Sequence, residues 1–520
     1  MTEPFGLPPI DYGAIAPMLI LFGASSVGVL VEAFVPRARR YPVQLVLTLA
    51  ALVAALVMVV LNADTRTVTV GGSITVDGPT LFLQGAILVL GLISMLLVAE
   101  RSLEPGGPFV AQAAVVVGSK RDAEQALREP GATEVFPLSL FSIGGMLLFV
   151  AASDLLTLFV ALEVLSLPLY LLCALARRRR LLSQEAALKY FMLGAYASAF
   201  FLFGIALVYG YTAGIPNGAD GALDFATIHT AVAESTASPL LLFAGIALIA
   251  VGLLFKVAAA PFHVWTPDVY QGAPTPITGF MAACTKVAAF GALLRVLHVA
   301  FSGAAWDYTP VLGGIAVLTM IVGAVLAVTQ TDIKRLLAYS SIANAGYLLV
   351  GALAPSKDGV ASTMFYLVAY GFTVIAAFAV ITLVRDGDGE ATHLSRWAGL
   401  GRRSPLYAAV FTFIMLAFAG IPLTSGFTSK FAVFGAAFGS GFDWLVIVGV
   451  ISSMVLAFPY LRVVVMMWLS EPGESTPAVT IPGGLTATAL TIGVGGRPLL
   501  GVGPQGACDF ARRRLGFGVS

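Results

Sequence analysis

Ionisable residues stand inside long apolar stretches of this 520-residue chain. A charged side chain within a membrane span is costly, and it is by default a hypothesis for a proton or ion path. An apolar setting favours the neutral amine of a lysine and a nearby carboxylate restores the charged form, so lysines mixed with a carboxylate suit proton transfer. The candidate residues are Glu163, Lys189, Lys256, Lys286, Arg295, His298, Lys430 and Arg462.

The depth of each candidate within its apolar run separates them. Glu163 lies eight residues into its run and Lys286 eleven, so they are about 12 and 17 Å deep at ~1.5 Å per residue. Neither reaches water easily from there, and we expect both to serve a path. Lys189 is three or four residues from a helix end, where a lysine anchored at the membrane surface is an open alternative. Arg295 and Arg462 are interpreted as counter-ions, because guanidinium keeps its proton.

Two of the lysines stand beside predicted helix breaks. Lys256 is followed by APFHVWTPDVYQGAPTP, which contains Pro261, and Lys430 ends the string AGIPLTSGFTSK, which contains Pro422. Proline and glycine at membrane depth free backbone groups that persist only where protein or water satisfies them. Broken helices are therefore pointers to an ion path, although a simple proline kink stays open for either site alone.

Two histidines lie near these features. His263 follows Pro261, and His298 lies one turn beyond Arg295. Each is a possible proton relay, because histidine titrates near neutral pH. A buried histidine whose nitrogens are hydrogen-bonded for packing is the alternative for both.

The composition excludes a soluble enzyme. The chain is 58% hydrophobic and 11% charged, with a mean hydropathy of +0.93, whereas soluble domains carry roughly 25% charged residues. The net charge of +1 gives no reason to expect nucleic-acid binding. The three cysteines share no metal-ligand spacing, so no disulfide framework, zinc site or iron–sulfur cluster is indicated. We predict an all-α polytopic membrane protein.

About 14 membrane spans are predicted, since each needs about 20 mostly apolar residues. The twelfth is too long for one straight helix and must be interrupted, and the fourteenth is weak. The predicted spans cover residues 14–34, 43–61, 80–99, 136–153, 155–176, 186–209, 239–259, 275–299, 310–329, 335–353, 361–384, 406–438, 444–468 and 480–496.

Basic residues orient these spans, because cytoplasmic loops are rich in Lys and Arg. The first residues lack the basic region of a cleaved signal, so the first span is expected to stay. With the N-terminus outside, the outer loops hold Arg66 and Lys357. The inner loops hold Arg37, Arg39, Arg40, Arg101, Lys120, Arg121, Arg128, Arg177, Arg178, Arg179, Arg180, Lys334, Arg335, Arg385, Arg396, Arg402 and Arg403.

An internal repeat is predicted. The segment GGMLLFVAASDLLTLFVALEVLSLPLY can be laid on GAVLAVTQTDIKRLLAYSSIANAGY, so that Gly145 matches Gly323 at an offset of 178 residues. The same offset carries Lys256 to a position near Lys430. Spans 4–8 and 9–13 then form two five-helix units, inverted because five is odd, although a chance match between apolar helices stays open. The division is 1–135 with three helices and an inner loop, 136–300 and 301–468 for the repeats, and 469–520 for a C-terminal segment.

The C-terminus departs from the orientation rule. A fourteenth span would put Arg512, Arg513 and Arg514 outside, and residues 493–506 are rich in glycine. Either the last span is short, or the final residues are aberrant. A reading-frame change near Val494 is one hypothesis for the second case.

Five strings resemble a known family. FVALEVLSLPLYLL, SQEAALKYFMLGAYASAF, FKVAAAPFHVWTPDVYQGAPTP, QTDIKRLLAYSSIANAGY and GIPLTSGFTSKF are similar to the subunit N family of bacterial NADH-quinone oxidoreductase, respiratory complex I. The resemblance covers about residues 77–468. The general pattern is shared with the other antiporter-like subunits and with multisubunit cation/proton antiporters, but PDVYQGAPTP and EAALKYF are closer to subunit N.

The resemblance implies a proton-translocating subunit with fourteen spans in two inverted five-helix repeats and discontinuous helices 7 and 12. It implies no cofactor in this chain, because flavin, iron–sulfur clusters, NADH and quinone belong to partner subunits. The partners would be the other membrane-arm and peripheral subunits and the lipid bilayer of the cell inner (plasma) membrane. Its proton-path residues fall on Glu163, Lys189, Lys256, Lys286 and Lys430.

Two departures from the family pattern stand out. Asn344 follows YSSIA where the family usually has histidine, which puts a relay role at that position in doubt. The sequence after about Val494 does not resemble the family's last helix.

Three hypotheses follow. The first is a proton-pumping subunit of a redox-driven complex, and the second is a subunit of a cation/proton antiporter that works without redox partners. The third is a membrane scaffold whose buried charges only fix helix packing. Replacing Lys256 or Lys286 would damage assembly in the third case and proton movement in the first two.

Overall fold

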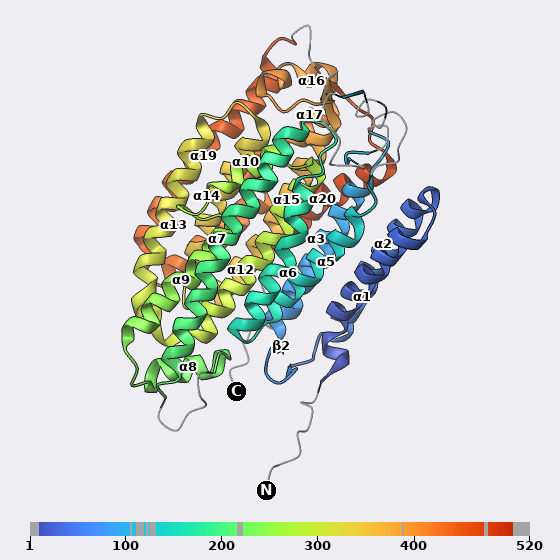
Figure 1. Cartoon of the computed structure of the whole chain (residues 1–520). Coiled ribbons are helices and arrows are strands. Elements are labelled where there is room, and N and C mark those ends of the chain that lie inside the picture. The colour runs from blue at the N-terminus through green and yellow to red at the C-terminus, as the bar shows by residue number, and fades with distance from the viewer. Residues whose placement is uncertain are drawn as a thin grey trace.

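The fold is an elongated bundle of roughly parallel helices (Figure 1). This computed structural model describes residues 10–103, 107–110, 119–120, 124, 132–215, 222–386, 389–472 and 477–502. Within the described residues, eleven helices are long and apolar enough to cross a membrane, and three shorter apolar helices accompany them. The predicted polytopic all-α class with about 14 spans is confirmed.

Each predicted span corresponds to a helix or a pair of helices. The bounds are α1 (Tyr12–Phe34), α2 (Arg37–Leu61), α3 (Gly78–Ala99), α5 (Val135–Ala151), α6 (Leu155–Cys173), α7 (Arg180–Thr212), α9 (Pro239–Val257) with α10 (Trp265–Gly272), α11 (Thr275–Phe280) continued by α12 (Lys286–Arg295), α13 (Ala305–Val328), α14 (Ile333–Leu353), α15 (Lys357–Leu383), α17 (Pro405–Ala419) with α18 (Ser425–Gly439), α19 (Asp443–Leu469) and α20 (Gly484–Val502).

Aspartates fix several helix starts. A side-chain oxygen that accepts a backbone N–H at the first turn satisfies a group that the helix itself leaves unpaired. Asp154 accepts from Thr157 N at 2.7 Å at the start of α6, and Asp332 accepts from Lys334 N at 2.9 Å at the start of α14. The same short polar residue therefore ends the loop and begins the span at both places.

The two predicted breaks are present. Between α9 and α10 the chain leaves the helix at Ala258, whose φ is 65°, and between α17 and α18 it leaves at Gly420, whose φ is 80°. Pro261 and Pro422 lie in the two breaks. A backbone group in the first break is satisfied across the bundle, since Ala260 N donates to Thr319 Oγ1 at 3.0 Å.

The helix that carries Lys286 is the centre of the bundle. It runs from α11 through the π-helical segment η1 (Met281–Thr285), α12 and a second π-helical segment, η2 (Val296–Ala300). Its most apolar 18-residue window is completely buried by other helices, whereas the windows of α1, α2, α7 and α19 are buried to 39% or less. The more exposed helices thus surround one helix whose most apolar segment is enclosed by the rest of the chain.

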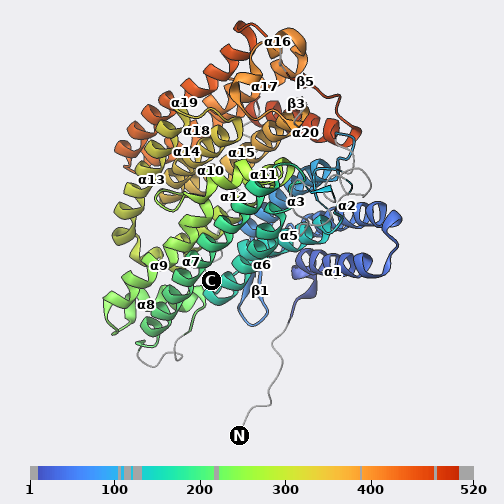
Figure 2. The ribbon, with the colours of Figure 1, turned by 45° about the horizontal axis from the view of Figure 1, so that its top comes forward.

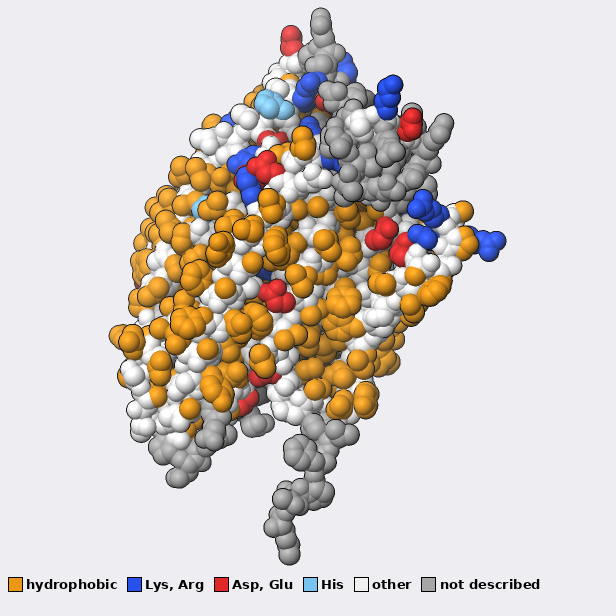
Figure 3. All heavy atoms as spheres, in the orientation of Figure 1, with side chains coloured by type: hydrophobic (Ala, Val, Ile, Leu, Met, Phe, Trp, Pro, Cys, Tyr) orange, Lys and Arg blue, Asp and Glu red, His pale blue; other side chains and the backbone are white. Residues whose placement is uncertain are grey.

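Charge separates the two ends of the bundle. Figure 3 shows a broad band of hydrophobic side chains, with Lys and Arg gathered near the end that holds α16 (Leu400–Arg403). The opposite end carries α8 (Phe225–Glu234) and the hairpin β1 (Thr67–Thr69) and β2 (Ile74–Val76), which are visible in Figure 1. Figure 2 shows α1 and α2 lying side by side at the edge of the bundle. Described parts of the loops predicted to be inner meet at this end, where Arg179 donates to Thr392 Oγ1 at 2.8 Å.

The last predicted span is a helix that begins and ends later than expected. α20 covers Gly484–Val502 and packs along α3 and α15. Its start is tied down because Glu100 Oε2 accepts from both Thr486 N and Thr486 Oγ1 at 3.2 Å. Residues 503–520, with Arg512, Arg513 and Arg514, lie outside the described residues, so the hypothesis of a frame change stays a prediction.

Candidate functional site

Three of the five predicted path residues are fully enclosed lysines. Lys256, Lys286 and Lys430 are exposed to 4%, 3% and 7%, and they lie on α9, α12 and α18. Each is set among hydroxyl groups, carbonyl groups and a tyrosine ring. A buried amine needs such partners because an unpaired polar group in an apolar interior is costly.

Lys256 stands in the last turn of α9, just before the first break. Its Nζ atom donates to Ser166 Oγ at 2.6 Å and to Tyr190 OH at 3.3 Å. The ring of Tyr170 lies 5.8 Å from Nζ and that of Tyr190 5.3 Å. A cation close to an aromatic ring is attracted by the ring quadrupole. The site can therefore hold the charged or the neutral amine without a carboxylate in direct contact.

Lys286 begins α12, directly after the π-helical turn η1. Its Nζ atom donates to the backbone oxygen and to the hydroxyl of Ser341, both at 2.6 Å. The ring of Tyr370 lies 5.1 Å away. The hydroxyls of Tyr270 and Ser341 are 3.5 Å apart, so polar groups continue from Lys286 toward α10.

Lys430 lies against the end of α17. Its Nζ atom donates to the carbonyl oxygens of Phe418 at 3.0 Å and Ala419 at 3.4 Å, and to Ser453 Oγ at 2.9 Å. The last carbonyls of a helix have no partner within it and carry partial negative charge. The second break thus supplies the acceptors that hold this lysine.

Polar side chains fill the space between Lys286 and Lys430. A small cavity of about 10 Å³ is lined by Asn344, Tyr366, Tyr370 and Lys430, among other residues. That is close to the minimum volume for one water. Because Tyr370 also lies beside Lys286, the cavity joins the surroundings of both lysines.

Asn344 takes part in this polar centre as a hydrogen-bonding group. Its Nδ2 donates to Ser340 O at 2.7 Å, and its Oδ1 accepts from Tyr366 OH at 2.5 Å. The Ser340 hydroxyl in turn contacts Tyr460 OH at 2.5 Å. An amide neither gains nor loses a proton near neutral pH, so Asn344 can orient its neighbours by hydrogen bonds but does not titrate.

Glu163 and Lys189 occupy a different setting, near the surface of α6 and α7. Glu163 is half-buried, and the Ser198 hydroxyl donates to its Oε1. Lys189 is exposed and pairs with Asp268 Oδ2 at 2.8 Å and with Glu185 Oε1 at 2.7 Å. Both residues are thus placed where a neighbouring chain could reach them, and the pairing of Lys189 argues against a solitary surface anchor.

A polar cavity opens near the basic end. It has a volume of about 60 Å³ and is lined by Arg179, Lys334, Thr275 and Glu390, among other residues. Lys334 is 3% exposed, and its Nζ donates to Ala273 O at 2.8 Å and to Thr275 Oγ1 at 3.2 Å. The Thr275 hydroxyl donates to Glu390. Charged groups thus lead from the loops to the beginning of the buried central helix.

The remaining candidates have structural contacts. Arg295 forms a buried ion pair with Asp77, whose two oxygens lie 2.8 and 2.9 Å from its NH2 atom. Arg462 donates to the backbone oxygens of Val328 and Gln330. The prediction that both arginines act as counter-ions fits Arg295, whereas the guanidinium of Arg462 binds backbone carbonyls.

The two histidines differ. His298 lies in η2, is partly buried, and forms a hydrogen bond of 2.8 Å between Nε2 and Ala352 O. His263 lies in the turn after Pro261, between α9 and α10. Within the described residues, neither histidine forms a hydrogen bond with one of the three buried lysines.

Among the described residues, no group of three or more His, Cys, Asp or Glu side chains is placed so that it could hold a metal ion. Cys173 and Cys284 are buried free thiols. Cys508 lies outside the described residues.

Several residues of the site do not stand out in the sequence. Asp268, in the string TPDVYQ, has a usable signal, because it is an acidic residue beside a break at membrane depth. Ser166, Ser341 and Ser453 have none, since serines are frequent in membrane helices and only packing selects those that meet a lysine. Lys334 is predicted to lie in an inner loop and is instead buried.

Comparisons with known proteins agree with one another. A family profile described as "NADH:quinone oxidoreductase/Mrp antiporter, TM" matches residues 152–456. NADH-quinone oxidoreductase subunit N of Salinispora arenicola is 75% identical over 505 residues, covering 97% of this chain and 98% of that protein.

Solved structures give the same result. A chain of respiratory complex I from Thermus thermophilus with bound aureothin has a TM-score of 0.77 at 32% identity, with 95% of this chain and 99% of that chain covered. A chain of the Mrp complex from Dietzia has a TM-score of 0.77 at 22% identity, with 96% of both chains covered, which shows a common fold.

Proposed function

Since the chain belongs to the NADH:quinone oxidoreductase/Mrp antiporter family, and within it to subunit N of NADH-quinone oxidoreductase, we propose that it translocates protons across the membrane through Glu163, Lys189, Lys256, Lys286 and Lys430. Electron transfer from NADH to quinone in the complex drives this movement. The observation that carries the proposal is the set of three enclosed lysines, which bind hydroxyls or carbonyls and, among the described residues, contact no carboxylate.

Such a setting suits reversible protonation. A carboxylate in direct contact would hold each lysine permanently charged, whereas hydroxyls and carbonyls leave the two forms closer in free energy. The hydroxyls also supply donors and acceptors for proton transfer over short distances. A change of charge at one lysine is felt at the next because the interior has a low dielectric.

Glu163 and Lys189 act at the entrance of this sequence of groups. The carboxylate of Glu163 is half-buried in the middle of α6, so it can interact electrostatically with charges of a neighbouring subunit and with charges in the interior. Lys189 can move between Asp268 and Glu185, because both carboxylates are already within 2.8 Å of its Nζ. A shift of Lys189 from one carboxylate to the other would change the electrostatic potential at the buried lysines.

The inner aqueous side would be reached through the polar cavity at Lys334, Thr275 and Glu390. Its volume of about 60 Å³ is well above the roughly 10–15 Å³ that one water needs. Water there would connect the inner surface with the start of the central helix.

Two inverted five-helix repeats organise the path. This division, at residues 136–300 and 301–468, is supported by a matched close contact. A Cβ on Gly145 would lie 2.6 Å from Leu165 N, and one on Gly323 would lie 2.4 Å from Ala343 N. Both members of the first contact are 178 residues before those of the second. Residues 1–135 and 469–520 flank the repeats.

The chain itself handles no redox cofactor in this proposal. Flavin, iron–sulfur clusters, NADH and quinone belong to the other membrane-arm and peripheral subunits, and the N-terminus faces the outside of the plasma membrane. The concentration of basic residues at one end of the bundle supports this orientation. The shared fold with an Mrp complex keeps cation/proton exchange as the alternative.

A variant of Lys286 tests the proposal. Inside-out membrane vesicles with Lys286→Met should contain the assembled complex but lose most NADH-driven acidification, with Lys357→Met as the matched control on an exposed lysine. Full acidification by a normally assembled Lys286 variant would overturn the relay. Failure of assembly alone would favour the scaffold hypothesis, and acidification driven by Na⁺ or K⁺ gradients without NADH would favour the antiporter.

A further inference from the structure

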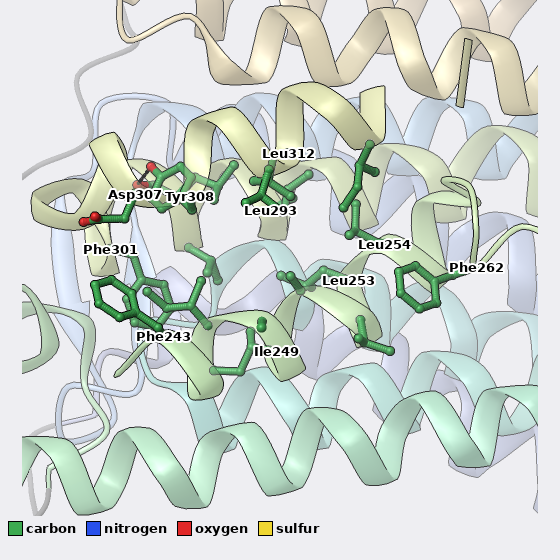
Figure 4. Close-up of a pocket in the computed structure, with 18 residues that line it drawn as sticks. Phe243, Ile249, Leu253, Leu254, Phe262, Leu293, Phe301, Asp307, Tyr308 and Leu312 are labelled. Atoms are coloured by element: carbon green, nitrogen blue, oxygen red, sulfur yellow. Dashed lines mark hydrogen bonds between the residues drawn. The ribbon is translucent and has the colours of Figure 1, made fainter. Parts of the chain in front are cut away.

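An apolar pocket lies outside the path, between α9, the central helix and α13. Its volume is about 520 Å³. The labelled side chains in Figure 4 surround it with Leu253 and Leu254 on one wall and Leu293 and Leu312 facing them, while Phe262 closes one end. Val311 on its wall is 64% exposed, so the pocket borders the membrane.

The length of the pocket matches one leaflet of a bilayer. Its lining residues on α9 extend from Phe243 to Leu254, which is about 16 Å at ~1.5 Å per residue. Half of a hydrocarbon core of ~30 Å is about 15 Å. The pocket therefore reaches from one membrane surface to the vicinity of the midplane.

The outer end of the pocket carries the marks of a membrane–water boundary. Asp307 and Tyr308 lie there with Phe243 and Phe301 (Figure 4), at the start of α13. The neighbouring Trp306 is 90% exposed, and tryptophan is enriched where the hydrocarbon meets the headgroups. Tyr308 OH donates to Leu297 O at 3.0 Å, which fixes the aromatic wall.

Among the described residues that line the pocket, Asp307 is the one charged side chain, and it is exposed. A carboxylate at headgroup level attracts a lipid headgroup that carries an ammonium group. It repels a lipid whose phosphate charge is not balanced by a positive group in the same headgroup. The pocket thus combines an apolar interior of acyl-chain length with a negative entrance.

We propose that this pocket binds one phospholipid with a primary-amine headgroup, with an acyl chain between α9 and α13 and the ammonium at Asp307. The lipid fills a space that protein side chains leave open beside the buried central helix. It separates Phe262, next to the first break, from the surrounding bulk lipid.

Quantitative lipid analysis of the purified complex tests this assignment. The complex is solubilised in mild detergent, partly delipidated and incubated with vesicles of equal phosphatidylethanolamine and phosphatidylglycerol. Ala250→Phe places a ring inside the pocket and should remove one retained phosphatidylethanolamine per complex. Val325→Phe, at a membrane-facing site of α13 outside the lining, is its matched control and should retain the wild-type number.

The headgroup assignment has its own variant. Asp307→Asn should keep the number of retained lipids but abolish the preference for phosphatidylethanolamine. Glu234→Gln removes an exposed carboxylate on the same side, outside the pocket lining, and should leave the preference intact. Ala247→Phe, on the same wall, serves as a second filling variant if Ala250→Phe reduces the yield of complex.

Four results would overturn the proposal. The first is wild-type lipid retention in both filling variants, and the second is that these variants lose phosphatidylglycerol and not phosphatidylethanolamine. The third is one isoprenoid quinone per complex that is extracted from the wild type and not from the filling variants. The fourth is a cryo-EM map in which a neighbouring subunit fills the pocket. Proton pumping by the complex is a separate readout, so this result and the relay test are independent.

Discussion

The Nζ atom of Lys430 lies 5.1 Å from the ring centroid of Tyr347. Lys256 stands in a similar relationship to Tyr170, at 5.8 Å. Each lysine adjoins a break in its own span, and each tyrosine is on a helix that is close-packed against its predecessor through a glycine. The pairing of a lysine with a tyrosine ring thus occurs once in each of the two proposed repeats.

The ring of Tyr347 should matter more than its hydroxyl. Tyr347→Phe keeps the ring beside Lys430 and loses the hydroxyl with its contacts, among them the one of 3.0 Å with Ser452 Oγ, so most proton pumping should remain. Tyr347→Leu removes a cation–ring interaction of about 0.5–2 kcal/mol and should lower pumping several-fold. Fluorescence quenching in inside-out vesicles measures both, and equal pumping by the two variants would contradict the role of the ring.

The carbonyl contacts of Lys430 predict the effect of its replacement. Lys430→Met cannot donate to Phe418 O and Ala419 O, and it cannot carry a proton. We expect a complex that still transfers electrons from NADH to quinone but moves fewer protons per electron. The ratio of acidification to NADH oxidation is the measurement, with Lys357→Met as the control; an unchanged ratio would exclude Lys430 from the path.

Two glycines should be equally intolerant of a methyl group. Gly145→Ala and Gly323→Ala would bring Cβ within 2.6 and 2.4 Å of backbone nitrogen atoms on the next helix. Overpacking of this kind costs ~1–3 kcal/mol, so the amount of assembled complex should fall. Gly314→Ala, also on α13, meets nothing within 4 Å and is the control. Thermal stability of the purified complex and its yield report the result, and wild-type values for both variants would refute the close contact.

The buried pair of Asp77 and Arg295 should make stability depend on pH. Burial disfavours ionised Asp77, but attraction and hydrogen bonds from Arg295 and Thr80 outweigh burial and hold the pKa of Asp77 below its usual range. Since an unfolded aspartate has a pKa of about 3.9, the pair stabilises the fold fully above that pH. The stabilisation is lost as the pH falls through the lower native pKa.

Removal of one partner reveals this contribution. Asp77→Asn leaves the charge of Arg295 in a site that is 4% exposed, and breaking a buried pair costs ~3–5 kcal/mol. The melting temperature should drop at pH 7, and the decline of stability in acid should become shallower than in the wild type. Parallel curves for the two proteins between pH 3 and 7 would show that Asp77 does not produce the acid sensitivity.

The spans and the enclosed lysines were accessible from the sequence because hydrophobicity over about 20 residues is a local property. Lys286 and Lys256 were recognisable from depth and from a neighbouring proline. The partners of these lysines were not, since Ser341 is 55 residues from Lys286 and Ser166 is 90 residues from Lys256. Such contacts depend on how helices are placed around one another, which periodicity does not encode.

The residues around Arg295 in the sequence also do not identify its ion-pair partner. Asp77 lies 218 residues away and is a helix cap as well as an ion-pair partner. For Lys189 the sequence left a surface anchor open, because its distance from the helix end says nothing of Asp268, 79 residues further on. The interpretation of Lys189 as a path residue therefore depends on the resemblance to a family and not on the local pattern.

Glu163 has a consequence for the biogenesis of the complex. Its carboxylate is half-buried near the middle of α6, and a charged group at that depth costs roughly 2.5–3.5 kcal/mol when it faces lipid. In a newly inserted copy that has not yet bound its neighbouring subunit, Glu163 would face lipid at this cost. In an assembled copy its carboxylate could lie against another protein surface. Unassembled and assembled copies would then differ in the free energy of this one side chain, so the carboxylate proposed for proton transfer would also favour assembly of the subunit with its neighbours.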